Sequence, residues 1–338
     1  MGCRVVEARS PSPKPRPTDE ARTAVEPTPP VRELRPTDAM GLAFTGWAVG
    51  STAVGCWLAT RASIVPWAAG QAVLAAAFLQ WFALLHECGH GTLFRTRRLN
   101  ALVGSLAGFF ALIPFRCWKP IHARHHKWTG WQDLDPTTAA LVPRPLGRFE
   151  RIAVNVCWRY WIPIFSVLYR AGNYWNLVRL FRLLRPRPAA AHWMAVEAVG
   201  LAAAWIAVAF ALGPAEFLRT AGPALFLSLV VEDVILLSQH THMPMRLSHG
   251  RDVAPYGALA QGPFTRSLRL PGWLSTMLLH FDAHELHHLH PAIPGYRLRE
   301  VRRPVPNEVG WTRWVPAARA VPGEVFLFQN RNQSGFNV

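Results

Sequence analysis

The sequence predicts an all-α protein that is integral to a membrane, with four transmembrane helices in two hairpins and a helical cap on the cytoplasmic side. Three observations lead to this fold class. Four apolar stretches are long enough to cross a bilayer, basic residues are distributed very unevenly between them, and three histidine-rich segments have helical spacing. The first observation gives the spans, the second their orientation, and the third a cluster of imidazoles in the cap.

The composition is that of a membrane protein with a basic exterior. Half of the 338 residues are apolar, 15 are Trp, and the formal net charge is +16. An apolar interior under a basic surface argues against a nucleic-acid partner and for membrane lipid. The five cysteines include no CxxC pair, so the sequence favours neither a disulfide framework nor a zinc ribbon.

The chain is expected to have three parts. Residues 1–38 are rich in Pro, Arg and Glu with few large apolar side chains, which predicts a disordered cytoplasmic tail. They hold no apolar run, so no signal peptide is expected. Residues 39–300 are predicted to form the membrane domain, and residues 301–338 a C-terminal cytoplasmic extension.

Four segments are predicted to span the membrane. Residues 41–60 and 64–85 form one hairpin, and residues 194–212 and 221–239 form the other. A span needs about 20 helical residues to cross about 30 Å of hydrocarbon. The apolar segment 99–115 is shorter, and 152–184 mixes Trp, Tyr and Arg, so both are expected to lie on the interface. A buried soluble helix is the alternative for 99–115.

The basic residues give the orientation. Residues 91–195 hold sixteen Lys or Arg against three acidic residues, whereas the hairpin loops hold only Arg61 and Arg219. By the positive-inside rule the basic region and both termini are cytoplasmic, and the protein is multi-pass. All three histidine segments then lie on the cytoplasmic side.

These segments are residues 86–90, 122–126 and 284–288. Each places imidazoles three or four residues apart, which on a helix brings them to one face. Imidazole suits iron, copper, nickel and zinc, so the ligand type does not select the metal. A structural zinc site would use about four ligands and leave the others unexplained. The segments therefore predict a polynuclear site, with these ligands: His86, His90, His122, His125, His126, His284, His287 and His288.

The chain resembles the integral membrane fatty acid desaturase superfamily, and within it the acyl-lipid type. HECGH, HARHH and HELHH match that family's three histidine boxes in order and spacing. The HKWTG sequence at 126–130 and the HPAIPGYRL sequence at 290–298 also follow the family manner. The QHTHMP sequence at 239–244 resembles an element that follows the fourth span in oleate-desaturating members. The resemblance covers roughly residues 41–300.

The resemblance implies a centre of two iron ions held by about nine histidines, with O2 as co-substrate. The ninth ligand is then His240 or His242, and His240 is preferred because it lies nearer the end of the fourth span. On a continuing helix the two rings would point about 200° apart.

Asp233, one heptad earlier, is expected to orient His240. The other candidates for positioning the ligands are His242, His280 and Asp282. Five acidic residues are further candidates for positioning the ligands. Four lie close to the boxes in the sequence: Glu87, Asp133, Asp135 and Glu285. The fifth, Glu232, lies within a span.

The resemblance implies a membrane-bound desaturase that introduces a cis double bond into a lipid-linked acyl chain. The chain would lie in an apolar tunnel lined by aromatic residues such as Trp81, Phe82 and Phe110. Electrons would come from outside, from a ferredoxin or a small cytochrome. A lipid or carotenoid hydroxylase or ketolase of the same superfamily is the alternative. A histidine-rich metal transporter is a remote one, because the histidines gather on one side of the membrane.

Overall fold

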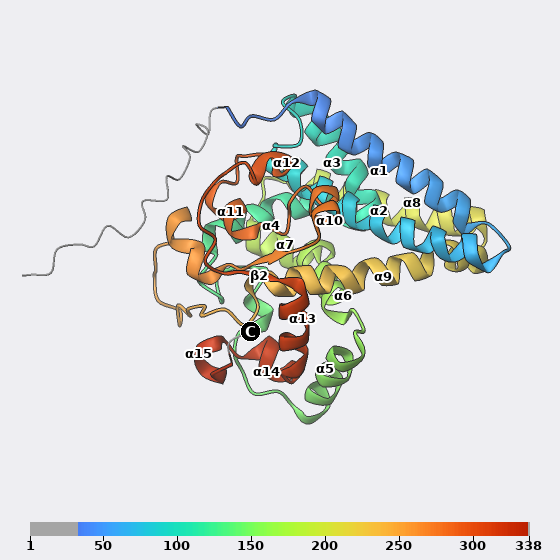
Figure 1. The fold of residues 1–338 in the computed structure, drawn as a ribbon. Coiled ribbons are helices and arrows are strands. Elements are labelled where there is room, and N and C mark those ends of the chain that lie inside the picture. Colours follow the sequence, from blue (N-terminus) through green and yellow to red (C-terminus); the bar gives the residue numbers. More distant parts are fainter. Residues whose placement is uncertain (1–32, 337–338) are drawn as a thin grey trace, which may run out of the picture.

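The computed structural model describes residues 33–336 (Figure 1). Most of the predicted tail, residues 1–32, lies outside that range, as do residues 337–338. Within 33–38, Leu34 is buried against Leu286, Ile293 and Leu298, and Thr37 caps the first helix by accepting a hydrogen bond from Met40 N. The packed part of the chain therefore begins a few residues before the predicted boundary at 39.

Four helices of the described chain are long and apolar enough to cross a membrane. They are α1 (Asp38–Ala59), α2 (Ile64–His90), α8 (Pro188–Leu212) and α9 (Pro214–His240). In Figure 1 they extend together to one side, with α2 packed against α1 and α9. The protein is thus mostly helical and has the four predicted apolar helices.

The break between α8 and α9 is shorter than the sequence predicts. The predicted loop ran from Gly213 to about residue 220, but the only residue outside both helices is Gly213. Its φ of 82° lies in the region that glycine adopts without steric cost. Pro214 and Pro223 are both inside α9, where Pro214 occupies the first turn that proline tolerates.

The two shorter apolar segments are bent pairs of helices. The first is α3 (Arg97–Ala111) followed by α4 (Phe115–Trp128), bent by 97°. The second is α5 (Arg148–Tyr160) followed by α6 (Ile164–Arg170) and a π-helical turn (Ala171–Trp175), bent by 116°. Counting each pair as one broken span would raise the number of candidate spans to six.

The remaining elements gather at one end of the long helices (Figure 1). They are short: 3-10 turns at Ala139–Leu141 and Ala258–Phe264, the helices α7 (Leu177–Leu184), α10 (Gly272–Met277), α11 (His284–Leu289), α12 (Gly295–Leu298), α13 (Trp311–Ala320), α14 (Gly323–Phe328) and α15 (Arg331–Ser334), and the strands β1 (Ser267–Arg269) and β2 (Glu308–Gly310). The two strands pair in parallel, with Leu268 opposite Val309.

The largest apolar cluster lies where α2, α4 and α9 meet this end of the molecule. Trp81, Leu84, Leu85, Ile121 and Trp118 in it are almost completely buried. A close approach of α4 to α2 requires Gly89, because a Cβ there would lie 2.1 Å from Cζ3 of Trp118. The cluster thus forms a rigid support for the histidine segments at the ends of these helices.

Candidate metal centre

Five histidine side chains converge to form one group, called here the five-histidine group: His86 and His90 at the end of α2, His122 and His126 on α4, and His287 on α11. One nitrogen from each lies within 4.8 Å of the others. His122 Nε2 is 2.8 Å from His90 Nε2 and 3.1 Å from His126 Nε2. The i, i+4 spacing on α2 and α4 therefore brings each pair to one point.

Four further histidine side chains form a second, four-histidine group: His125 on α4, His240 at the last residue of α9, and His284 and His288 on α11. His240 Nε2 is 2.9 Å from His284 Nε2. His288 Nε2 is 3.1 Å from His284 Nε2 and 3.2 Å from His125 Nε2. All four residues are buried.

Consecutive residues supply different groups. His125 and His126 follow each other on α4, yet their rings are 67° apart and join separate groups. His287 and His288 divide in the same way on α11, with rings 87° apart. The HxxHH spacing thus serves both groups from one helix, and the two groups adjoin where the rings of His126 and His288 stack 4.4 Å apart.

Hydrogen bonds behind the rings fix which nitrogen faces the centre. His240 Nδ1 donates to the carbonyl oxygen of Phe264 at 3.0 Å. His125 Nδ1 lies 2.7 Å from Oδ2 of the buried Asp135, and Thr137 Oγ1 donates to the other carboxylate oxygen. Because a carbonyl and a carboxylate only accept, each ring carries its proton on Nδ1 and presents a lone pair at Nε2.

Gln261 fixes His288 in the same manner. Its Nε2 donates to the carbonyl oxygens of His126 and Tyr256, so its Oε1 must face His288 Nδ1 at 2.9 Å. In the five-histidine group, Glu87 Oε1 is 3.2 Å from His86 Nδ1, and its Oε2 accepts from Thr92 Oγ1 and Gly295 N. Together with His125 and His240, the rings of His86 and His288 thus have a defined tautomer.

The donor set fits a pair of transition-metal ions. Lone pairs of neighbouring Nε2 atoms at 2.8–3.2 Å repel one another unless a cation lies between them. Metal–nitrogen bonds of about 2.1 Å that meet near a right angle separate their donors by about 3 Å. His86 Nε2 is buried without a partner among the described residues. Burial lowers the pKa of His284, His287 and His288 well below the usual range, which keeps the imidazoles neutral as ligands.

Asp233 was expected to orient His240, and the structure corrects this. Asp233 Oδ1 accepts hydrogen bonds from Ser166 N and Oγ on α6, and His240 is held by Phe264 instead. The preceding Glu232 forms a buried ion pair with Arg170, Oε2 to Nη2 at 2.5 Å. Glu232 and Asp233 of α9 therefore both fasten α6 to that helix.

The other three positioning candidates bond to residues outside the two histidine groups. The helix ends at His240, and His242 follows in a left-handed conformation, with its Nε2 2.8 Å from Ser334 Oγ. The separation of about 200° that a continuing helix would give therefore does not apply to His240 and His242. His280 Nδ1 donates to Ser275 Oγ, which donates to Asp282 Oδ1. Asp282 also pairs with Arg299.

Of the four acidic candidates chosen because they are near the boxes in the sequence, only two contact a histidine of the groups. Asp135 and Glu87 contact histidines of the groups, whereas Asp133 accepts from Ser248 and Glu285 from Asn307 N. No sequence pattern pointed to Gln261 or to the Phe264 carbonyl. Both lie in the short 3-10 turn Ala258–Phe264, and any residue could supply a carbonyl.

A narrow cavity borders both groups. His86 and His122 of the five-histidine group line it beside His125, His240 and His284 of the four-histidine group. Its other walls are mainly apolar and aromatic: Phe82, Trp118, Leu141, Phe165, Tyr169, Tyr174, Leu236 and Phe281. Of the three aromatic residues expected along a tunnel, Phe82 lines this cavity, whereas Trp81 stacks on Phe110 away from it.

Comparison with known proteins finds one family. The fatty acid desaturase family model matches residues 62–316. A probable fatty acid desaturase DES1 of Sorghum bicolor is 27% identical over 259 residues, which cover 74% of this chain and 66% of that protein. The sn-1 oleoyl-lipid 12-desaturase of a Picosynechococcus strain is 26% identical over 242 residues, covering 65% and 63%.

A third relative is the temperature-sensitive sn-2 acyl-lipid omega-3 desaturase (ferredoxin) of Arabidopsis thaliana, chloroplastic, which is 26% identical over 239 residues. The match covers 66% of this chain and 52% of that protein. The chain thus spans between half and two thirds of the length of the curated relatives it matches.

Proposed function

This chain belongs to the fatty acid desaturase family, and on that premise we propose that it is a membrane-bound, oxygen-dependent fatty acyl desaturase. Its substrate would be an acyl chain linked to a membrane lipid, and its product the same chain with a new cis double bond. We propose that the nine histidines hold two iron ions, one in each group.

The observation that carries this proposal is the cavity between the two groups. Its walls combine five of the nine histidines with apolar and aromatic side chains. An alkyl chain in it would lie beside both groups at once, shielded from water by Phe82, Leu236 and Phe281. Transport of a metal needs a polar path across the bilayer instead, and the histidines gather at one end of the long helices.

The bound irons would supply the activation of dioxygen that breaks an unactivated C–H bond, which no side chain can do. The protein's own residues hold the centre and the substrate. Asp135, Gln261 and the Phe264 carbonyl keep three rings in one tautomer and orientation. The aromatic walls restrict the alkyl chain to a few conformations and so place one pair of adjacent methylenes beside the centre.

We further propose that α1 with α2, and α8 with α9, cross the membrane as two hairpins. The excess of basic residues in 91–195 supports a cytoplasmic location for the histidine-bearing end and for both termini. In this arrangement the cap consists of the short elements between and after the spans, and the described residues from 301 onward extend it.

The electron donor is proposed to be a small acidic protein that docks on α4. The names of two relatives specify a ferredoxin and a cytochrome b5 respectively. On α4, Arg116, Lys119 and Lys127 are exposed, and the same helix supplies ligands to both groups. Opposite charge would steer the donor to the helix nearest the iron ions.

The test is expression in a yeast or bacterial host that has few native double bonds. New double bonds located by mass spectrometry in extracted lipids, together with about two iron atoms per purified chain, would agree with the proposal. Hydroxylated products instead of alkenes would show that the protein is a hydroxylase and not a desaturase. A single zinc atom per chain and unchanged host lipids would contradict the proposed centre.

A further inference from the structure

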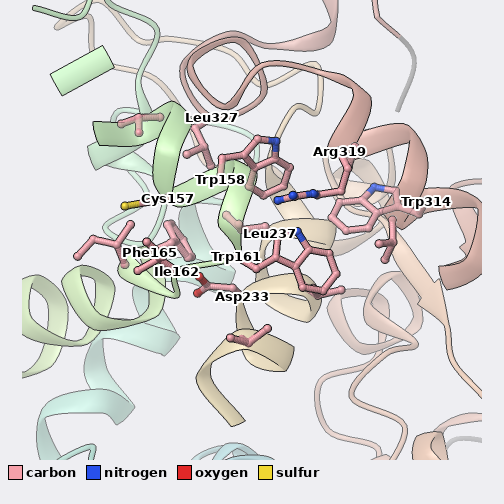
Figure 2. A pocket seen from close by; sticks show the side chains of 16 residues that line it. Cys157, Trp158, Trp161, Ile162, Phe165, Asp233, Leu237, Trp314, Arg319 and Leu327 are labelled. Carbon is pink, nitrogen blue, oxygen red and sulfur yellow. The ribbon is translucent and has the colours of Figure 1, made fainter. Parts of the chain in front are cut away.

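A second cavity lies between α5, α6, α9 and α13 (Figure 2). Its walls are almost entirely apolar, with the large rings of Trp158, Trp161 and Trp314 around it. Of the residues that line it, the charged ones are Asp233 and Arg319. An apolar cavity with few polar groups is the usual form of a site for a largely hydrocarbon ligand.

This cavity adjoins the one at the histidine groups. Phe165 lines both, and the neighbouring residues Leu236 and Leu237 of α9 line the first and the second respectively. A ligand that extends past the ring of Phe165 would therefore reach from the second cavity to the centre. The two cavities are therefore neighbours along α9, with Phe165 between them.

Two hydrogen-bond donors at this cavity lack partners among the described residues. Trp314 is 2% exposed, and its Nε1 is buried without an acceptor. Arg319 Nη1 is likewise buried without an acceptor, although Nη2 donates to the carbonyl oxygen of Arg159. The guanidinium of Arg319 is held over the rings of Trp158 and Trp161, at 5.5 and 5.1 Å (Figure 2). Unpaired buried donors are costly, and an acceptor oxygen in the cavity would satisfy both.

The surroundings of the cavity are suited to a membrane surface. On α5, Phe149, Ile152, Val156 and Tyr160 expose one apolar face, and Phe149 is 85% exposed. Ile162 and Ile164, which line the cavity, are also exposed. Such a helix lies in the interface between headgroups and hydrocarbon, so a lipid could enter the cavity from the bilayer without crossing water.

Building on the proposed desaturase activity, we propose that this cavity binds the ester end of a membrane glycerolipid. Arg319 and Trp314 donate hydrogen bonds to the acyl ester carbonyl, and the hydrocarbon chain continues past Phe165 to the histidine groups. The lining favours an ester over a coenzyme A thioester, because one arginine in an apolar wall does not provide for several phosphates. Arg319 lies beyond the residues that the family model matches, so the site depends on the chain's own C-terminal helices.

The test is photo-crosslinking of the purified full-length protein in nanodiscs. The probe is a phosphatidylcholine with a diazirine near the ester end of one acyl chain, and labelled peptides are identified by mass spectrometry. We expect label in residues 154–165 and 311–327. Arg319→Gln should reduce the labelling about tenfold and Trp314→Phe about threefold, as for the loss of a charged and a neutral hydrogen bond. Arg313→Gln on the same helix, where Arg313 is exposed, should label like the wild type.

Label outside these segments, or equal labelling of all three variants with unchanged melting temperatures, would overturn the inference. So would competition by oleoyl coenzyme A at lower concentration than by unlabelled phosphatidylcholine. Iron content and product formation are measured on the same preparations. A protein that holds iron and forms double bonds without labelling the cavity refutes the ester site alone, whereas labelling without iron or product refutes the desaturase proposal.

Discussion

In the four-histidine group, three of the four rings are fixed from behind, by Asp135 with Thr137, by Gln261, and by the Phe264 carbonyl. In the five-histidine group, His86 alone has such a partner among the described residues, and that partner is Glu87. The rings of this larger group are held instead by helix spacing and by packing. Trp118, for example, stacks on His122 with ring centroids 4.3 Å apart.

For the proposed centre, the difference indicates two ways of holding a metal ion. Five donors from three helices can lose one and still leave four, so their individual orientation matters less. Four donors have no such reserve, and hydrogen bonds that fix each tautomer compensate for the smaller number. The four-histidine group should therefore depend more on residues that never touch the metal, and the five-histidine group more on the distance between α2 and α4.

The largest effect is expected from removal of a ligand. His126→Ala and His288→Ala should both reduce product formation to background, because the reaction needs both groups. Their iron contents should differ: His288→Ala should fall to about one atom per chain, while His126→Ala should keep more, since four donors remain. Metal analysis of both purified variants measures this. Equal iron loss in the two variants would contradict the proposed difference between the two groups.

A second test separates His240 from His242. His240→Ala should lose iron and activity, because its Nε2 is 2.9 Å from His284 Nε2. His242→Ala should keep the iron with at most a partial loss of rate, because its ring stacks on Phe326 and its Nε2 contacts Ser334. Iron content and product formation are compared in the two variants. Loss of iron from His242→Ala would mean that His242 is a ligand in solution.

The sequence predicted the four long apolar helices and eight histidines of the two groups, because each depends on a pattern within one segment. The ninth, His240, came only from the family resemblance and from its place at the end of a predicted helix. Prediction from the sequence failed where the partner comes from elsewhere in the chain. Asp233 was assigned to His240 from helical register, which finds only neighbours on the same helix, and its partner Ser166 lies on α6. Gln261 and the Phe264 carbonyl were missed because their role depends on how a loop packs on α11.

Residues behind the four-histidine group should have a smaller but clear effect. Asp135→Asn and Gln261→Leu each weaken the support of one ring, and we expect iron affinity to fall about 10- to 100-fold. The rate of iron release to a chelator measures this. The matched control is Asp133→Asn, two residues from Asp135, since Asp133 bonds to Ser248 and not to a histidine. A control that releases iron as fast as Asp135→Asn would mean that the loop, rather than the hydrogen bond, holds the metal.

The smallest effect on iron should come from packing at the five-histidine group. Gly89→Ala would place a Cβ 2.1 Å from Cζ3 of Trp118, so the Trp118 ring or the whole of α4 must shift away from α2. Overpacking of this kind costs about 1–3 kcal/mol of unfolding free energy, but four or five donors should limit the loss of iron affinity to about threefold. Trp118→Phe removes the outer ring atoms that clash, so the double variant should regain melting temperature relative to Gly89→Ala. If the double variant is instead less stable than either single change, Gly89 is required for a reason other than its contact with Trp118.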